Sequence, residues 1–183
     1  AGAVAAVIFN DRPGPFQGGL VNPSSIPAVT IDQGEGDRLR QALAREGVRV
    51  RVWALWQERD SFNVVAEVPG TGPDLVILGA HYDSVPGSPG ASDNASGTAV
   101  LLTLAQELKG RSWPFTLRFI AFGAEEEGLW GSRAHIGTLS KDESPSVKAM
   151  VSLDVLGARN VALKAIGHQE LASRIDRVAR RLG

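Results

Sequence analysis

The segment Leu75-Val-Ile-Leu-Gly-Ala-His81-Tyr-Asp83 joins an apolar run directly to a histidine and a carboxylate. The run is short, rich in branched apolar residues and preceded by the turn residues Thr71-Gly-Pro-Asp74, which predicts a buried strand at 75–80. A glycine-rich loop follows, and then a helical pattern at 97–109 that ends at Gly110. Because a strand followed by a helix is the repeating unit of α/β proteins, this segment predicts an α/β fold.

Strand-like and helix-like patterns alternate along the rest of the chain. Strands are expected at 3–9, 26–31, 48–54, 63–68, 115–122, 147–153 and 160–166, and helices at 36–45, 128–139 and 169–182. Ser96 stands where the N-cap of the helix at 97–109 is expected. The alternation indicates one sheet with helices packed on it.

Side chains of the kinds that bind metals stand at or just after the ends of three expected strands. They are His81, Asp93, the pair Glu125 and Glu126, and Asp154. A single such aspartate is more often a helix cap or turn residue, and a lone glutamate pair is usually a solvated face. In open α/β sheets, however, ligands bind outside the carboxyl ends of the strands. The set as a whole therefore predicts a metal centre with a base beside it, and metal-assisted hydrolysis.

Composition limits the partners and the metal. The 183 residues carry a net charge of −1 with no basic stripe, which argues against a nucleic-acid partner. No apolar run is long enough to span a bilayer, and residues 1–9 lack the charged start of a signal peptide. Without cysteine, any metal must bind imidazole and carboxylate, a set that suits zinc or manganese. The only methionine is Met150, so the chain is expected to be processed or cut from a longer protein.

The local motifs suggest how each group would act. Asp83 follows His81 by two residues and could hold the ring nitrogen that does not face a metal. The small residues of Gly90-Ala-Ser-Asp93-Asn-Ala-Ser-Gly97 would let the backbone turn Asp93 towards the strand ends, where one carboxylate can bridge two metals about 3.5–4 Å apart. Of the adjacent Glu125 and Glu126, one could bind metal while the other takes a proton from water.

These motifs, with Ala124-Glu-Glu-Glu-Gly-Leu-Trp-Gly-Ser132 and Ser152-Leu-Asp-Val-Leu-Gly157, occur in an order that resembles the two-zinc aminopeptidases. That family includes bacterial leucyl-type aminopeptidases and their glutamate-carboxypeptidase relatives. The resemblance spans nearly the whole chain and implies a mixed, mostly parallel sheet flanked by helices. Residues 58–183 resemble part of the peptidase domain, and residues 1–57 resemble the later part of a β-rich protease-associated domain. The chain thus resembles an internal fragment of a larger enzyme.

The resemblance also implies a ligand set. His81, Asp93 and Asp154 would bind one zinc, and Asp93 would bridge to a second zinc that Glu126 also holds. The peptide bond between Asp93 and Asn94 would be cis.

Two further residues receive roles from the resemblance. Glu125 would be the general base and acid, and Asp83 would orient the metal-binding histidine. The implied reaction is hydrolysis of N-terminal peptide bonds by a water that two zinc ions activate. A peptide substrate and a secreted or periplasmic location follow from the same resemblance, and the oligomeric state is left open.

The sequence departs from the family at the second zinc, which takes one more histidine well downstream of Asp154. The chain ends at Gly183 before that position. His168 and His135 could stand in for it, although the first is expected in a strand-to-helix turn and the second in an exposed helix. We therefore expect one zinc or none in this chain, and little activity. Alternatives are a dipeptidase, a glutamate carboxypeptidase, a one-zinc relative resembling glutaminyl cyclase, and a non-catalytic binding module.

Overall fold

The computed structural model describes residues 2–14, 24–45, 47–53, 58–157 and 165–182. The chain divides into two compact units, Ala1–Ser61 and Phe62–Gly183, which are described separately. Among the described residues, no helix combines the length and apolar character needed to cross a bilayer.

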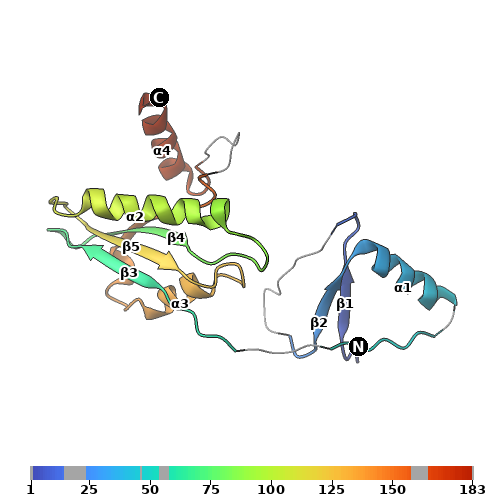
Figure 1. Cartoon of the computed structure of the whole chain (residues 1–183). Coiled ribbons are helices and arrows are strands. Elements are labelled where there is room, and N and C mark those ends of the chain that lie inside the picture. The colour runs from blue at the N-terminus through green and yellow to red at the C-terminus, as the bar shows by residue number, and fades with distance from the viewer. Residues whose placement is uncertain (1, 15–23, 46, 54–57, 158–164, 183) are drawn as a thin grey trace. The chain divides into compact units, whose positions relative to one another are not determined.

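The first unit contains two strands and a helix. β1 (Ala6–Phe9) pairs in parallel with β2 (Ala28–Ile31), and α1 (Gln33–Arg45) follows directly (Figure 1). Asp32 begins the helix because its Oδ1 accepts the backbone N–H of Glu35 at 3.0 Å.

The prediction of a strand at 48–54 is wrong for residues 48–53, the part that the structure describes. Residues 48–53 form no strand, and residue 54 lies outside the described residues. Val48, Val50 and Val52 alternate with polar residues as a strand would, but Val50 is 49% exposed and no described strand pairs with the segment. An alternating pattern places the apolar side chains on one face, but a strand forms only where a neighbouring strand accepts and donates its backbone hydrogen bonds.

The second unit is built on a four-stranded sheet. Its strands are β3 (Val64–Val68), β4 (Leu75–His81), β5 (Thr116–Phe122) and β6 (Val147–Ser152), in the order β3-β5-β4-β6. β4 runs parallel to both of its neighbours, and β3 is antiparallel to β5. The mixed, mostly parallel sheet is therefore confirmed.

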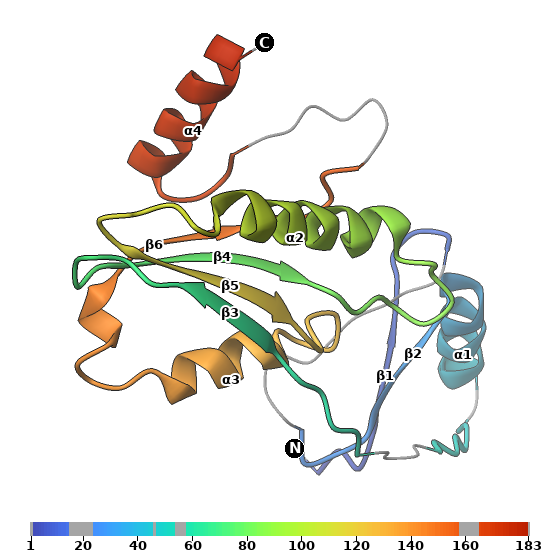
Figure 2. The ribbon, with the colours of Figure 1, turned by 60° about the vertical axis from the view of Figure 1, so that its left-hand side comes forward.

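Helices cover both faces of this sheet. α2 (Ser96–Leu108) lies on one face and α3 (Trp130–Thr138) on the other (Figure 2). Because side chains alternate along a strand, β5 directs Leu117 and Phe119 towards the α2 side and Ile120 and Phe122 to the opposite side. The short turn η2 (Ser144–Ser146) precedes β6, and α4 (Gln169–Leu182) ends the described chain.

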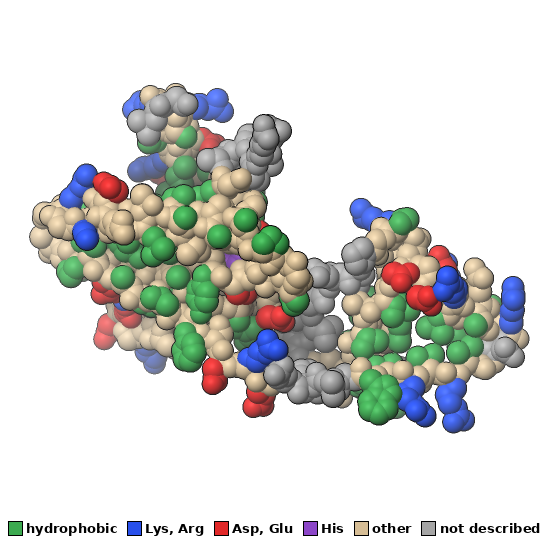
Figure 3. Space-filling model, viewed as in Figure 1, with side chains coloured by type: hydrophobic (Ala, Val, Ile, Leu, Met, Phe, Trp, Pro, Cys, Tyr) green, Lys and Arg blue, Asp and Glu red, His purple; other side chains and the backbone are tan. Residues whose placement is uncertain are grey.

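Apolar side chains remain exposed on the surface of this unit (Figure 3). Val64 and Val65 on β3, which lies at one edge of the sheet, are 64% and 48% exposed. They point to opposite faces, so β3 is solvated on both sides in this chain.

Two further expectations need correction or fall outside the structure. Ser96 is the first residue of α2 and not its cap; its hydroxyl donates to the carbonyl of Ser92 at 2.7 Å. The first turn is capped instead by Asn94, whose Oδ1 accepts the N–H of Gly97 at 3.0 Å.

Of the strand expected at 160–166, residues 160–164 lie outside the described residues, and 165 and 166 form no strand.

Candidate metal centre

The candidate metal-binding side chains follow the ends of three parallel strands, at one edge of the sheet. His81 at the end of β4 pairs with Phe122 at the end of β5, so the loop that carries Glu125 begins beside the histidine. On the other side, the N–H of Leu153 donates to the carbonyl of Gly79 at 2.8 Å and carries the chain into Asp154. Parallel strands end at the same edge, so residues far apart in the sequence meet there.

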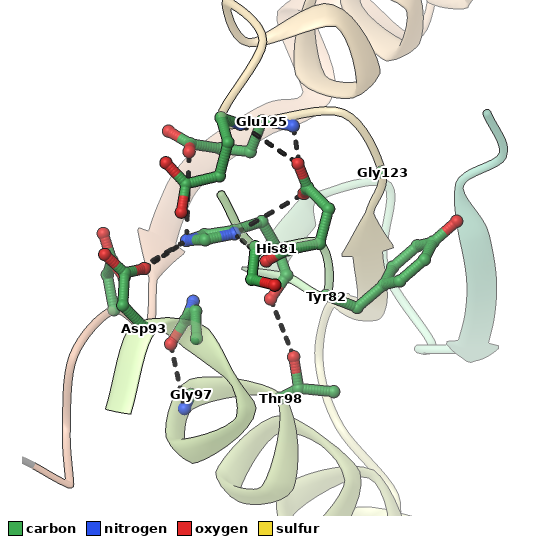
Figure 4. Close-up of polar contacts among 12 residues, drawn as sticks. His81, Tyr82, Asp93, Gly97, Thr98, Gly123 and Glu125 are labelled. Atoms are coloured by element: carbon green, nitrogen blue, oxygen red, sulfur yellow. Dashed lines mark hydrogen bonds and ion pairs between the residues drawn. The ribbon is translucent and has the colours of Figure 1, made fainter. Parts of the chain in front are cut away.

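The ring of His81 lies at the centre of the cluster (Figure 4). Its Nε2 is 3.1 Å from Oδ1 of Asp93, 3.4 Å from Oδ1 of Asp154 and 3.9 Å from Oε2 of Glu125. Its Nδ1 lies 3.2 Å from the backbone carbonyl oxygen of Asp83, which can only accept, so we assign the ring proton to Nδ1. The Nε2 lone pair then faces carboxylates that cannot donate to it. Only a cation or a proton between them makes this arrangement favourable.

The spacing of the donors fits a metal ion. Ligand atoms of His81, Asp93 and Glu126 all lie within 4.8 Å of one another. Tetrahedral zinc with bonds of about 2.0–2.2 Å separates its ligand atoms by about 3.3–3.6 Å. The distances from Nε2 to Asp93 and Asp154 are 3.1 and 3.4 Å, close to that separation. The donor types and their spacing therefore suit zinc.

Negative charge is concentrated around the ring. Burial opposes protonation of His81, but Glu125, Asp154, Asp83 and Asp93 together outweigh it and raise the pKa of the imidazole. Burial also raises the pKa of Glu125; attraction to His81 opposes this, and repulsion from neighbouring carboxylates adds to it. Both pKa values are raised, so a bound cation would stabilise this group of side chains.

Asp83 connects the end of β4 to the glutamate loop. Its Oδ1 accepts the N–H of Glu125 at 3.0 Å, and its Oδ2 accepts the N–H of Glu126 at 3.1 Å. The same Oδ1 lies 3.5 Å from Nδ1 of His81, farther than the backbone carbonyl of Asp83 itself. Asp83 thus contacts the ring mainly through its backbone and orients both glutamates through its carboxylate.

Asn63 holds the two ends of the loop 123–131 together, a role that the sequence did not indicate. Its Oδ1 accepts the N–H of Gly123 at 3.2 Å, and its Nδ2 donates to the carbonyl of Gly131 at 2.8 Å. A Cβ on Gly131 would collide with the carbonyl of Gly123 and lie 2.5 Å from Oδ1 of Asn63. No local pattern could reveal Asn63, because its partners stand 60 and 68 residues away.

Backbone strain also borders the site. Ala124 precedes Glu125 with φ of 51°, and Val155 follows Asp154 with φ of 51°. Non-glycine residues in this region cost about 1–3 kcal/mol and persist where the surrounding structure holds them, often at functional sites. The peptide bond between Asp93 and Asn94 is cis, as the resemblance implied.

Neither remaining histidine joins the cluster within the described part of the chain. His135 lies in a helix, α3, whose residues are mostly exposed, but its own ring is half-buried edge-on against Phe122 and its Nε2 is buried without a hydrogen-bond partner. Burial, and then the charge of Arg118, lower the pKa of His135. His168 lies at the start of α4, in a hollow with Glu170 and Arg174.

Comparisons with known proteins point the same way as the geometry. Leucine aminopeptidase 2 of Trichophyton equinum is 34% identical over 167 residues, which cover 88% of this chain and 34% of that protein. Aminopeptidase YwaD of Bacillus subtilis is 37% identical over 160 residues, which cover 86% of this chain and 35% of that protein. The crystal structure of BSAP, a zinc aminopeptidase from Bacillus subtilis, matches with a TM-score of 0.78 and 31% identity, covering 100% of this chain and 47% of that chain.

A glutaminyl cyclase of an Acidobacteriales bacterium shares the fold, with a TM-score of 0.58 and 21% identity over 66% of this chain and 47% of that chain. The chain spans about a third of the length of the curated relatives it matches. A model of peptidase family M28 matches residues 63–183, the whole of the sheet-bearing unit apart from its first residue. The chain therefore belongs to peptidase family M28.

Proposed function

We propose that this protein is a zinc-dependent aminopeptidase that hydrolyses N-terminal peptide bonds. The observation that carries the proposal is the buried His81, whose Nε2 faces three carboxylates between 3.1 and 3.9 Å away. A binding module has no need of such a concentration of like charge beside an imidazole. Membership of a peptidase family and the aminopeptidase relatives support the same reaction.

We assign the ligands as the resemblance implied. His81, Asp93 and Asp154 would hold one zinc, and Asp93 with Glu126 would hold a second. Zinc in this position supplies Lewis acidity that activates water and polarises the substrate carbonyl. Asp83 keeps both glutamates in place through their backbone N–H groups.

Glu125 is the proposed proton carrier. Its carboxylate lies 3.9 Å from Nε2 of His81, the farthest of the three, which leaves it free to contact a reacting water. It would accept a proton from the attacking water and deliver that proton to the leaving amine. Burial raises the pKa of Glu125, which favours uptake of a proton by this carboxylate.

The proposal is tested on the protein at its natural length with an aminoacyl-anilide. Glu125→Gln should keep the zinc and lose about 10²–10⁴-fold in kcat, the usual contribution of a general acid–base group. The neighbouring exposed Glu127 offers a matched control, because Glu127→Gln makes the same chemical change in the same loop and should leave turnover unchanged. Near-normal turnover of Glu125→Gln, or loss of its zinc, would refute the role.

Zinc stoichiometry separates the alternatives. Two ions per molecule of the active protein support the two-zinc peptidase, one supports a cyclase-like reaction, and none supports a binding module. For residues 1–183 alone we propose one tight zinc at most. The resemblance gives the second position only Asp93 and Glu126 among the described residues, and two carboxylates without an imidazole favour harder ions than zinc. Two tight sites by titration calorimetry would contradict this.

Two finer assignments start from the resemblance. We propose that residues 1–57 are part of a protease-associated domain, supported by their separation from the peptidase unit as a compact body. We also propose that the enzyme acts outside the cytoplasm, which cell fractionation of the natural host would test.

A further inference from the structure

Asn94 is a buried side chain with every polar atom in use. It is 1% exposed and, with Ile120, one of the two largest fully buried side chains among the described residues. Its Oδ1 accepts the N–H of Gly97 at 3.0 Å and that of Val155 at 3.3 Å, and its Nδ2 donates to the carbonyl of Leu153 at 2.9 Å. A buried amide makes three such bonds only where the surrounding backbone is fixed.

These partners place Asn94 between two carboxylates of the cluster. Asp93 precedes it directly in the turn η1 (Ala91–Ala95), and Leu153 and Val155 stand on either side of Asp154. One amide group therefore joins the start of α2 to the end of β6, across about 60 residues of sequence. Figure 4 shows the bond from the N–H of Gly97, with Asp93 pointing towards the ring of His81.

We infer that Asn94 is a positioning residue that sets the distance between Asp93 and Asp154 for the metal. The inference rests on the proposed function, since it concerns the ligands of the proposed zinc site. The two segments are already at their closest approach, because a Cβ on Gly97 would collide with the carbonyl of Leu153 and with Oδ1 of Asn94. Asn94 thus holds them together through backbone groups alone.

Metal geometry makes this distance critical. Oδ1 of Asp93 and Oδ1 of Asp154 lie 3.1 and 3.4 Å from the same nitrogen of His81. Zinc tolerates ligand distances that depart from ideal by only about 0.2 Å. A small separation of the two segments would therefore remove one carboxylate from reach. Groups that orient metal ligands from outside typically change metal affinity about 10–100-fold.

The test compares Asn94→Ala with Leu75→Ala in the protein at its natural length. Leu75 is 4% exposed and begins β4, at the end of the strand opposite His81, so its loss destabilises the sheet without touching the cluster. Zinc affinity is measured by calorimetry on the folded protein, and stability by urea unfolding in EDTA. We expect Asn94→Ala to weaken zinc binding by about 10–100-fold, and Leu75→Ala to change it less than about two-fold at a comparable loss of stability.

A second variant and a second measurement keep the test decisive. Asn94→Leu keeps the branched outline of the side chain but removes its hydrogen-bonding groups, and it should weaken zinc binding in the same way. Hydrogen exchange of the metal-free protein should show faster exchange at Gly97 and Val155 in both variants, with the amides of β4 unchanged. A purely structural role would lower the urea midpoint of both Asn94 variants and leave their zinc affinity equal to that of Leu75→Ala.

The possible results distinguish a failure of the inference from a failure of the proposed metal centre. Unchanged zinc affinity in the Asn94 variants, with normal binding by the unsubstituted chain, overturns the inference and leaves the proposed metal centre standing. Absence of zinc binding by the unsubstituted chain overturns the metal centre and the inference with it. Failure of both Asn94 variants to fold, while Leu75→Ala folds, shows that Asn94 holds the fold itself and also overturns the positioning role.

Discussion

Replacing Asp83 by asparagine tests whether one carboxylate holds the glutamate loop in place. Asp83→Asn keeps the size and shape of the side chain but changes one oxygen to an NH₂ group. The native carboxylate accepts two backbone N–H groups, at 3.0 Å from Glu125 and 3.1 Å from Glu126. Asparagine has only one oxygen, so one of these N–H groups would face another donor.

The expected cost follows from these two bonds. A hydrogen bond to a charged group contributes about 1.5–3 kcal/mol, and the variant loses one such bond and weakens the other to a neutral one. Because the side chain of Asp83 is 22% exposed, water can satisfy part of the loss. We therefore expect the free energy of unfolding to fall by about 2 kcal/mol. Zinc affinity should also fall about 10–100-fold, because the orientation of Glu126 is loosened.

The assay is urea unfolding in EDTA, followed by circular dichroism, together with zinc titration of the folded protein. Asp74→Asn is the control, because Asp74 makes one exposed ion pair with Lys148 at 3.6 Å, and such pairs contribute at most about 1 kcal/mol. If Asp83→Asn unfolds at the same urea concentration as the unsubstituted chain and binds zinc equally well, the proposed role of the carboxylate is refuted.

Three other substitutions test neighbouring features. In zinc-free protein at pH 7, Glu125→Gln should raise the urea midpoint, because the raised pKa of Glu125 means that its charge opposes folding; a lower midpoint would contradict this. Gly131→Ala should lower the free energy of unfolding by about 1–3 kcal/mol, because the added Cβ would force α3 away from Gly123. Gly137→Ala on the same helix is the control: its Cβ would meet nothing within 4 Å, so it should be neutral or slightly stabilising. Equal unfolding curves for the two variants would refute the close packing at Gly131. His135 has a lowered folded pKa, so its unfolded form binds more protons below about pH 6.5, and stability should fall as the pH drops through that value. His135→Phe should remove this part of the pH dependence, and identical pH profiles for the two proteins would show the reasoning wrong.

The sequence alone determined the elements of the peptidase unit and which of its residues could bind metal. Hydrophobic periodicity is a local property, so the strands at Leu75–His81 and Thr116–Phe122 and the helices at Ser96–Leu108 and Gln169–Leu182 were predicted to within a residue or two. The candidate ligands could be named because strand ends in an α/β sheet share one edge. Their roles as zinc ligands remain predictions.

Tertiary structure decided what depends on contacts between distant segments. The alternating pattern at 48–53 formed no strand because no described neighbour pairs with it. The carboxylate of Asp83 reaches two backbone N–H groups 42 and 43 residues away, and Asn63 and Asn94 join segments about 60 residues apart. Asparagine has no periodic signature and is common in turns, so only the folded chain distinguishes a buried, fully bonded amide from a solvated one. Periodicity therefore determined the elements, and the packing of strand ends decided how the carboxylates are held around the imidazole.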